Sequence, residues 1–404
     1  MKRLLFVLDI GFDRGGPSVH LLQDVIRAGL ADGNEIEVIL KDTNGSDKTM
    51  PDDFVKNPNF MYYAIKEVND EKKQGFAARY LNEVKYAKKC SKYYLKQKKY
   101  DAVFLQSNTT AFFYMRLLKK LKCRIVFNVQ DIFPYNLMLS GQLPFERIMF
   151  PVFRKLQNLA YKRADSIITI SDDMKQTLVR DGVESNKIYV VYNWSYADSL
   201  ISFDKISIEN KSKIVMDQNL YNIVYAGNIG KMQNVELIAE TARELKNEPQ
   251  IHFYIIGDGS NMKSIRDIVK GLDNVSLYPI QPAKYAESIY AQADLNIIPL
   301  MPGGIKTALP SKTATVLRVN KPVLFCIDDD SEFANFCSQL DGTEVFGVNK
   351  GKSKELAKRI KEIYYRQLSD QNKIDRTSQL KRFTKSNSYR YIEMLCCDTI
   401  NSCH

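Results

Sequence analysis

The chain has 404 residues, of which 45% are hydrophobic, and it carries a formal net charge of +11. This length and composition predict two ordinary domains with their own cores and exclude a disordered chain. No stretch approaches the roughly eighteen uninterrupted apolar residues of a membrane-spanning helix.

The N-terminus begins with an apolar run that we interpret as a β-strand, from Arg3 to Ile10. A charge interrupts the run and no small-residue cleavage site follows it, so we expect a strand rather than a signal peptide, and a cytoplasmic protein. Gly15 and Gly16 then turn the chain into a helix, and a second strand follows at Glu35 to Leu40. Strand, glycine turn and helix form the repeating unit of a parallel sheet, and the two glycines would let a ligand approach the backbone.

A lysine-rich helix is predicted next. Between Val84 and Lys99 there are seven lysines and no acidic residue. The expected inward stripe of this helix is Leu81, Val84, Ala87, Ser91, Tyr94 and Leu95. Two interpretations of the lysines remain open, a solvated face and a surface for anionic lipid, which attracts each lysine by about 1 kcal/mol. No nucleic-acid-reading motif accompanies the charge, so we expect no nucleic-acid partner.

Further strands are predicted at Asp101 to Leu105, Arg124 to Val129 and Ala164 to Ser171. Between the last two lies an apolar, aromatic-rich segment with interspersed cations, Tyr135 to Tyr161. It fits either a pair of core helices or a surface that touches lipid or a lipid-linked substrate.

The second half of the chain repeats the same pattern after a polar linker at 201–219. Its predicted strands are Tyr221 to Ala226, His252 to Ile256, Val275 to Leu277, Asp294 to Ile298 and Val323 to Ile327. Glycine turns at Gly227 and Gly257 follow two of these strands, and together with the loop at Gly303 they predict a ligand-facing rim. We therefore expect an N-terminal domain at 1–200, a C-terminal domain at 220–380 and a last helical segment at 381–404.

The loop that begins at Gly303 leads into a predicted helix start at Pro310 and Ser311. A Ser side chain can cap such a start, and the remaining free amides, the helix dipole and Lys312 would favour a phosphate group. The alternative is an ordinary connection between a loop and a helix. Asp328 and Asp330, further along, are interpreted as loop residues rather than metal ligands.

The order and spacing of these motifs resemble a family 4 glycosyltransferase of the bacterial capsule and O-antigen type. The motifs that carry the resemblance extend along nearly the whole chain: Gly15-Gly16-Pro17, Gln130-Asp131-Ile132-Phe133-Pro134, Ala164-Asp165, Asn193-Trp194, Ala226-Gly227-Asn228-Ile229-Gly230-Lys231, Gly257-Asp258-Gly259, Ala293-Asp294, Pro310-Ser311-Lys312 and Lys321-Pro322-Val323.

The resemblance implies an α/β GT-B fold, with two Rossmann-like domains facing a central cleft and a C-terminal helix crossing back to the N-terminal domain. It implies retaining transfer of a sugar from a nucleotide-sugar donor to a lipid-linked glycan acceptor, with no metal or other cofactor, at the inner face of the plasma membrane. Asp131 is the candidate catalytic group on the acceptor side, although it could instead cap a turn. The implied donor-binding residues are Gly15, Gly16, Asn228, Lys231, Gly257, Pro279, Ile280, Ser311, Lys312 and Thr315.

One departure from the family leaves alternatives open. The family carries two glutamates eight positions apart around the predicted helix, and here Thr307 and Thr315 stand in their places. A threonine hydroxyl binds a ribose hydroxyl less strongly than a charged acceptor does. The departure favours a second hypothesis, a catalytically weak partner that binds a nucleotide-sugar or glycan and regulates an active transferase. A nucleotide-sugar epimerase is a third, although three histidines in the chain offer few acid and base groups.

Overall fold

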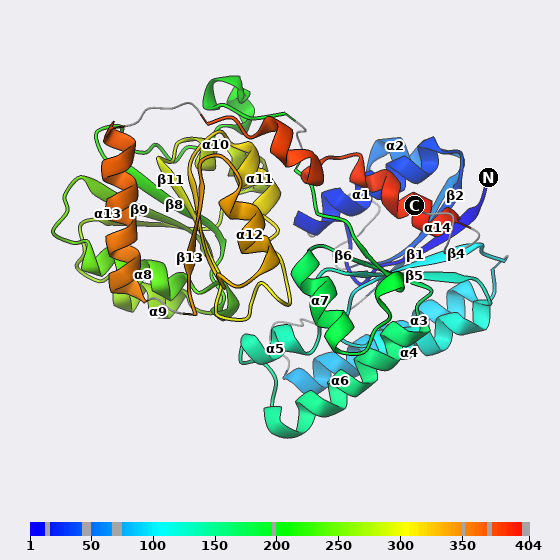
Figure 1. Cartoon of the computed structure of the whole chain (residues 1–404). Coiled ribbons are helices and arrows are strands. Elements are labelled where there is room, and N and C mark those ends of the chain that lie inside the picture. Colours follow the sequence, from blue (N-terminus) through cyan, green and yellow to red (C-terminus); the bar gives the residue numbers. More distant parts are fainter. Residues whose placement is uncertain are drawn as a thin grey trace. The chain divides into compact units, whose positions relative to one another are not determined.

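The computed structural model describes residues 1–12, 17–42, 50–66, 75–97, 99–195, 199–349, 352–369 and 374–397. The chain forms two compact units (Figure 1). Unit 1 comprises Met1–Asn193 and Lys385–His404, and unit 2 comprises Trp194–Thr384.

Unit 1 is built on a seven-stranded parallel sheet with the order β3-β2-β1-β4-β5-β6-β7. Its inner strands are almost wholly buried because helices cover both faces, which explains their continuous apolar sequences. The strands are β1 (Arg3–Val7), β2 (Glu35–Asp42), β3 (Phe60–Lys66), β4 (Ala102–Gln106), β5 (Arg124–Val129), β6 (Ser166–Thr169) and β7 (Ile188–Val190).

The helices of unit 1 include one from the far end of the chain, α14, which packs against α1, β4 and β5. Asn387 at its start donates from Nδ2 to the carbonyl of Tyr192 at 2.8 Å, and Tyr391 is buried beside the Phe104 ring. The predicted return of the last helix to the N-terminal domain is confirmed. The helices are α1 (Pro17–Ala31), α2 (Asp52–Val55), α3 (Phe76–Tyr94), α4 (Ala111–Leu118), α5 (Tyr135–Leu139), α6 (Glu146–Arg163), α7 (Asp172–Arg180) and α14 (Asn387–Cys396).

Unit 2 repeats the architecture with a six-stranded parallel sheet of order β10-β9-β8-β11-β12-β13. One apolar cluster fills the space between this sheet and helices α8, α9 and α13. The strands are β8 (Tyr221–Asn228), β9 (Ile251–Asp258), β10 (Val275–Tyr278), β11 (Leu295–Pro299), β12 (Val323–Ile327) and β13 (Thr343–Gly347). The helices are α8 (Val235–Glu244), α9 (Met262–Ile268), α10 (Ala286–Ala291), α11 (Thr313–Arg318), α12 (Glu332–Ser338) and α13 (Ser353–Ser369).

The segment 201–219 is not the linker that we predicted, because it packs against unit 2. Ile201 forms an isolated parallel bridge with Val319, the amide of Ser212 donates to Ser288 Oγ at 2.8 Å, and Met216 is buried. The segment is irregular in backbone, so its few anchoring apolar residues leave no periodicity in the sequence.

The unit boundaries also differ from the predicted ones. Unit 1 ends at Asn193 rather than at 200, and its last segment begins at Lys385 rather than at 381. Phe383 belongs to unit 2 because it is buried there and its carbonyl accepts from the Arg318 guanidinium at 3.0 Å.

The inward face of α3 is rotated from the predicted one. Ala87, Ser91 and Tyr94 are buried as expected, but Leu81 and Leu95 are 58% and 41% exposed. Tyr86 and Cys90 are also buried, and the prediction did not include them. It had placed Leu and Val residues on the inward face instead. Among the described residues, no helix is long and apolar enough to cross a membrane.

Candidate functional site

Each unit places its ligand-facing loops where the strand order reverses. In unit 1 the chain runs outward from β1 through β2 to β3 and then returns to β4 on the other side of β1. In unit 2 it runs from β8 through β9 to β10 and returns to β11 beside β8. At such a switch point the loops at the carboxyl ends of two neighbouring strands separate and leave a crevice, where ligands of open α/β sheets bind.

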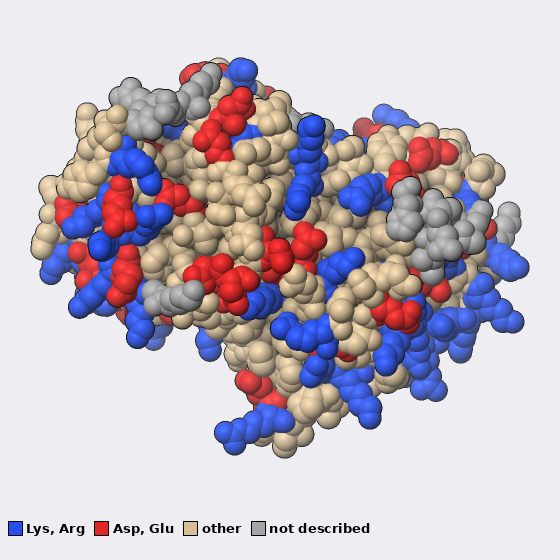
Figure 2. Space-filling view, viewed as in Figure 1, with Lys and Arg blue, Asp and Glu red and all other residues tan. Residues whose placement is uncertain are grey.

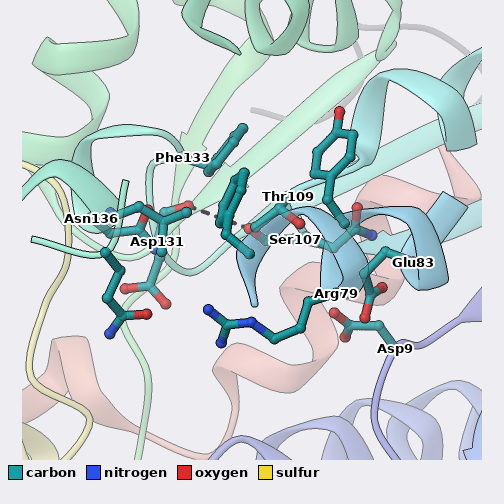
Figure 3. A pocket seen from close by; sticks show the side chains of 13 residues that line it. Asp9, Arg79, Glu83, Ser107, Thr109, Asp131, Phe133 and Asn136 are labelled. Carbon is teal, nitrogen blue, oxygen red and sulfur yellow. Dashed lines mark hydrogen bonds between the residues drawn. The ribbon is translucent and has the colours of Figure 1, made fainter. Parts of the chain in front are cut away.

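A cavity of about 320 Å³ lies at the switch point of unit 1. Asp9 follows β1, Ser107 follows β4 and Asp131 follows β5, so three strand ends contribute to its wall. Figure 3 shows these side chains around the cavity. The full lining is Asp9, Phe76, Arg79, Tyr80, Glu83, Ser107, Asn108, Thr109, Asp131, Phe133, Asn136, Leu137 and Gln142.

Asp131 projects its carboxylate into this cavity (Figure 3). Ser107 holds the loop by donating from Oγ to the backbone carbonyl of Asp131 at 3.3 Å. The Asp131 residue is exposed, and desolvation by the surrounding protein raises the pKa of its carboxyl group to about 6. A carboxylate with a pKa near neutrality can accept a proton from a hydroxyl group, which is the chemistry of a general base.

Arg79 and Glu83, two charged residues of α3, also line the cavity, and no sequence motif predicted them. In Figure 3 the Arg79 side chain extends between Asp131 and the pair Asp9 and Glu83. Glu83 also forms an ion pair at 2.6 Å with the buried amine of Lys41. Neither Arg79 nor Glu83 belongs to a sequence motif. Their only signal in the sequence is a four-residue spacing along a helix, which is too common to indicate a site.

Aromatic rings form the apolar side of the cavity. Phe76 and Tyr80 from α3 and Phe133 from the loop after β5 pack on Phe153 of α6, with ring centroids 5.7, 5.2 and 5.3 Å away. A cavity with an aromatic wall on one side and carboxylate, amide and guanidinium groups on the other suits a sugar ring, which has apolar C–H faces and a rim of hydroxyl groups.

In unit 2 the amine of Lys312 lies at the corresponding place, beside the end of β8. Its Nζ is 3.8 Å from the centroid of the Tyr225 ring, and a Cβ on Gly227 would come within 2.7 Å of it. The Nζ is buried and has no hydrogen-bond partner among the described residues. Desolvation lowers the pKa of Lys312 to about 7, so this amine would gain from an anionic partner.

The helix start predicted at Ser311 is displaced. Helix α11 begins at Thr313 with Lys312 as its N-cap residue, and no side chain caps it. The amide of Thr313 donates to the Pro310 carbonyl at 2.9 Å, so a tight turn satisfies the group that Ser311 was expected to cap. Helix α11 is only about one and a half turns long, so it has little dipole. An anion at this place would be attracted mainly by the Lys312 amine.

Several other residues predicted to bind the nucleotide-sugar lie at or after the carboxyl ends of the unit 2 strands. Asn228 ends β8 and donates from Nδ2 to Gln233 Oε1 at 3.1 Å, while Lys231 is exposed three residues later. Pro279 and Ile280 directly follow the edge strand β10 and are exposed.

The remaining predicted residues have other surroundings. Thr307 is buried and its hydroxyl donates to the Gly304 carbonyl at 3.1 Å, whereas Thr315 is half-buried on α11. Gly257 has no room for a side chain because the carbonyl of Gly227 lies against it. Gly15 and Gly16 lie outside the described residues.

Two family models match the chain, one in each half. The Glycosyltransferase Family 4 model matches residues 15–194, and the model for Glycosyl transferases group 1 matches residues 221–365. These ranges fall within unit 1 and unit 2 except for Trp194, the first residue of unit 2.

Two curated relatives are similar over about half of the chain. WcaI of Escherichia coli strain K12, named as a colanic acid biosynthesis glycosyl transferase, is 25% identical over 241 residues, which cover 57% of this chain and 58% of the relative. WbjE of Pseudomonas aeruginosa, named as a glycosyltransferase, is 25% identical over 222 residues, covering 52% of this chain and 53% of the relative. The chain thus matches little more than half the length of either relative.

Solved structures with the same fold cover the whole chain. Anabaena HepE in complex with UDP and glucose superposes with a TM-score of 0.62 at 15% identity, over 100% of this chain and 97% of HepE. UDP-GlcNAc 2-epimerase from Neisseria meningitidis bound to UDP-GlcNAc has a TM-score of 0.55 at 16% identity, over 98% of this chain and 99% of the epimerase. At these identities the likeness concerns the fold, which transferases and an epimerase share. Because the two family models together cover most of the chain and follow its two parallel-sheet units, the protein belongs to the glycosyltransferases of the family 4 type and has the GT-B fold.

Proposed function

We propose that the protein is a retaining glycosyltransferase that moves a sugar from a nucleotide-sugar to a lipid-linked glycan during the synthesis of a cell-surface polysaccharide. The observation that carries the proposal is the enclosed amine of Lys312 at the switch point of unit 2, beside Gly227 and without a hydrogen-bond partner among the described residues. A fixed cation at the place where a leaving diphosphate develops charge stabilises the transition state. We propose that this lysine supplies the charge, without a metal ion.

We propose the class of the donor from the ligands bound in solved structures that share this fold. HepE was solved with UDP and glucose, and the epimerase with UDP-GlcNAc, both in the GT-B fold. These ligands support a nucleotide-sugar, with UDP as the first nucleotide to test. The name of WcaI supports a role in polysaccharide synthesis.

The acceptor site that we propose is the cavity of unit 1, with Asp131 as the group that orients or deprotonates the attacking hydroxyl. The adjoining helix α6 supports a lipid-linked acceptor because large apolar side chains are exposed at and just before its start, beside exposed Arg147 and Lys155. Phe145, Ile148 and Val152 are 82%, 68% and 49% exposed, whereas Phe153 on the inner face packs against the cavity wall. We propose that the segment Tyr135 to Tyr161 serves in both ways, with one face in the core and another face available to lipid.

We further propose that unit 1 associates with the inner face of the plasma membrane through α3 and the residues that follow it. The exposed lysines of this segment are Lys85, Lys88, Lys89, Lys92, Lys96 and Lys99. Figure 2 shows Lys and Arg gathered at the lower right of the view, where Figure 1 labels α3 and α4. The exposed Leu81 and Leu95 add apolar contacts on the same segment. Basic and apolar groups together match an anionic lipid surface.

A catalytically weak partner protein is the second candidate. Thr307 favours it, because its hydroxyl is already bonded to the Gly304 carbonyl and its side chain is buried. A residue in that state cannot replace a ligand-binding glutamate, so of the two threonines only Thr315 is left to contact the donor.

The first test is a thermal-shift and calorimetry screen with UDP, GDP, CDP and their common sugar conjugates. A ligand of the native state raises the unfolding temperature in proportion to RT ln(1 + [L]/Kd). We expect one nucleotide to bind, and we expect Lys312→Met to weaken that binding by about 10- to 100-fold, since a charge-assisted contact contributes roughly 1.5–3 kcal/mol.

The matched control is Lys284→Met, which removes another lysine that lies over a tyrosine ring in unit 2, with Nζ 5.1 Å from the Tyr285 centroid. It should leave nucleotide affinity unchanged. If no nucleotide binds to the parent protein, the transferase proposal fails. Binding without any sugar transfer to lipid-linked acceptors would favour the partner protein instead.

A further inference from the structure

The surroundings of the Lys312 amine are apolar and aromatic. The Tyr225 ring lies 3.8 Å from Nζ, and Tyr225 is 1% exposed. A ring face compensates a desolvated ammonium only in part, by about 2 kcal/mol. Burial of the charge costs more than that, and this desolvation lowers the pKa of Lys312 to about 7. Near neutral pH this lysine is therefore divided between the amine and the ammonium form.

The loop beside the amine is fixed by hydrogen bonds on both sides of Gly227. Tyr225 donates from its hydroxyl to the Asn228 carbonyl at 2.5 Å, and Tyr290 donates to the Ala226 carbonyl at 2.8 Å. Gly227 has φ +146, and a Cβ there would lie 2.7 Å from Nζ. These hydrogen bonds resist a turn of the loop that would offer the amine a carbonyl, so we consider a bound ligand as its partner.

Resting on the proposed function, we propose that the unpartnered Lys312 amine, enclosed over the Tyr225 ring, takes up a proton when the diphosphate of the nucleotide binds. The step moves one proton from a buffer acid or hydronium to the Nζ lone pair and breaks no bond of the protein or the nucleotide. Release of the nucleotide returns the proton. Donor binding is thus linked to pH above neutrality, and Tyr225 is a positioning residue that keeps the amine enclosed until the ligand arrives.

The two tyrosines that hold this loop do not titrate in this range. Burial raises the pKa of Tyr225 well above its ordinary value, and it raises the pKa of Tyr290, which faces Tyr225, as well. The nucleotide contributes little above pH 7.5, because a terminal phosphate loses its second proton near pH 6. Proton uptake at pH 8 would therefore report on Lys312.

The test is calorimetric titration of the nucleotide selected by the screen, at pH 8 and pH 6, in two buffers with different enthalpies of protonation. The difference in observed heat between buffers gives the number of protons bound. With a pKa of about 7 in the free protein, we expect the parent to take up about 0.9 proton at pH 8. We also expect the affinity of the parent to fall about tenfold per pH unit above pH 7.5.

Two variants test whether the proton is bound by Lys312 itself. Lys312→Arg retains a charge at every pH, so it should bind the nucleotide with no proton uptake at pH 8 and with a flat affinity profile. Lys284→Arg, the same change at an exposed position, should behave as the parent does.

The outcomes separate this inference from the proposed function. If the parent binds the nucleotide at pH 8 without taking up a proton, or if Lys312→Arg still takes one up, the proton linkage is wrong and the transferase proposal stands. If neither the parent nor Lys312→Arg binds any of the nucleotides, the donor site itself is wrong.

Discussion

The carbonyl oxygen of Gly227 occupies the space that a Cβ on Gly257 would need, where β8 and β9 run side by side in register. Both glycines had been identified in the sequence as turns facing a ligand. Gly257 is required by the packing of two neighbouring strands, whatever else it contacts.

We therefore expect Gly257→Ala to lower the free energy of unfolding by about 1–3 kcal/mol, because one strand must move away from the other. Chemical denaturation of the purified variant measures this. Gly75→Ala is the control, since a Cβ there meets nothing within 4 Å and φ is −65°. A Gly257→Ala protein as stable as the Gly75→Ala protein would contradict the register of β8 and β9.

Lys312→Met should make the nucleotide-free protein more stable while it weakens nucleotide binding. The folded-state pKa of about 7 lies below the ordinary value of 10.5, so the fold disfavours the charged form. The penalty is complete below pH 7 and disappears as the pH rises toward 10.5. Met fills a similar volume without a charge, and the gain at pH 6 should be on the order of a few kcal/mol.

Denaturant unfolding at pH 6, 8 and 9.5 measures this difference. The advantage of Lys312→Met over the parent should shrink steadily across that series, and Lys284→Met should show no trend. A Lys312→Met protein that is less stable than the parent at pH 6 would mean that the ammonium has a partner in the fold.

Asp131→Asn should reduce the rate of sugar transfer by about 100-fold or more, the typical contribution of a general base, and leave nucleotide affinity unchanged. In the parent, the rate should fall as the pH drops through 6, because the carboxylate has a raised pKa of about 6 and only its ionised form accepts a proton. The variant should lose this acidic limb.

A radiolabelled or chromatographic transfer assay across pH 5 to 8 follows both effects. Asp52→Asn serves as the control because its side chain is 92% exposed, on a different helix of the same unit. Retention of the acidic limb by Asp131→Asn would assign that limb to another group.

Reversing Lys88, Lys92 and Lys96 to Glu should remove most binding to vesicles of anionic phospholipid at low salt. Each lysine near such a surface contributes about 1 kcal/mol, and each reversal adds repulsion. Vesicle co-sedimentation measures the effect.

The control for the charge change reverses three exposed lysines of unit 2, Lys246, Lys263 and Lys270, which alters the net charge equally. If the two triple variants partition alike, α3 has only a solvated face. Neutral vesicles should bind the parent weakly, which separates charge attraction from insertion of Leu81 and Leu95.

The sequence alone determined the fold class and the repeated strand, glycine turn and helix. These features are local, because a strand buried on both faces must be continuously apolar and a tight turn needs glycine. The strands that the sequence missed are β3, β7 and β13, all at sheet edges. The half-exposed residues of β3 and β13 mix polar and apolar side chains, so they carry no distinct pattern.

Only the tertiary structure decided how the site is assembled. Asp9, Arg79 and Ser107 meet Asp131 because the strand order places β4 beside β1 and α3 over their carboxyl ends, and residue spacing does not encode that order. Lys312 was visible in the sequence as a cation near a glycine loop. Its enclosure over Tyr225, and hence its lowered pKa, depends on packing between segments nearly ninety residues apart, and desolvation is a property of that packing rather than of any local motif.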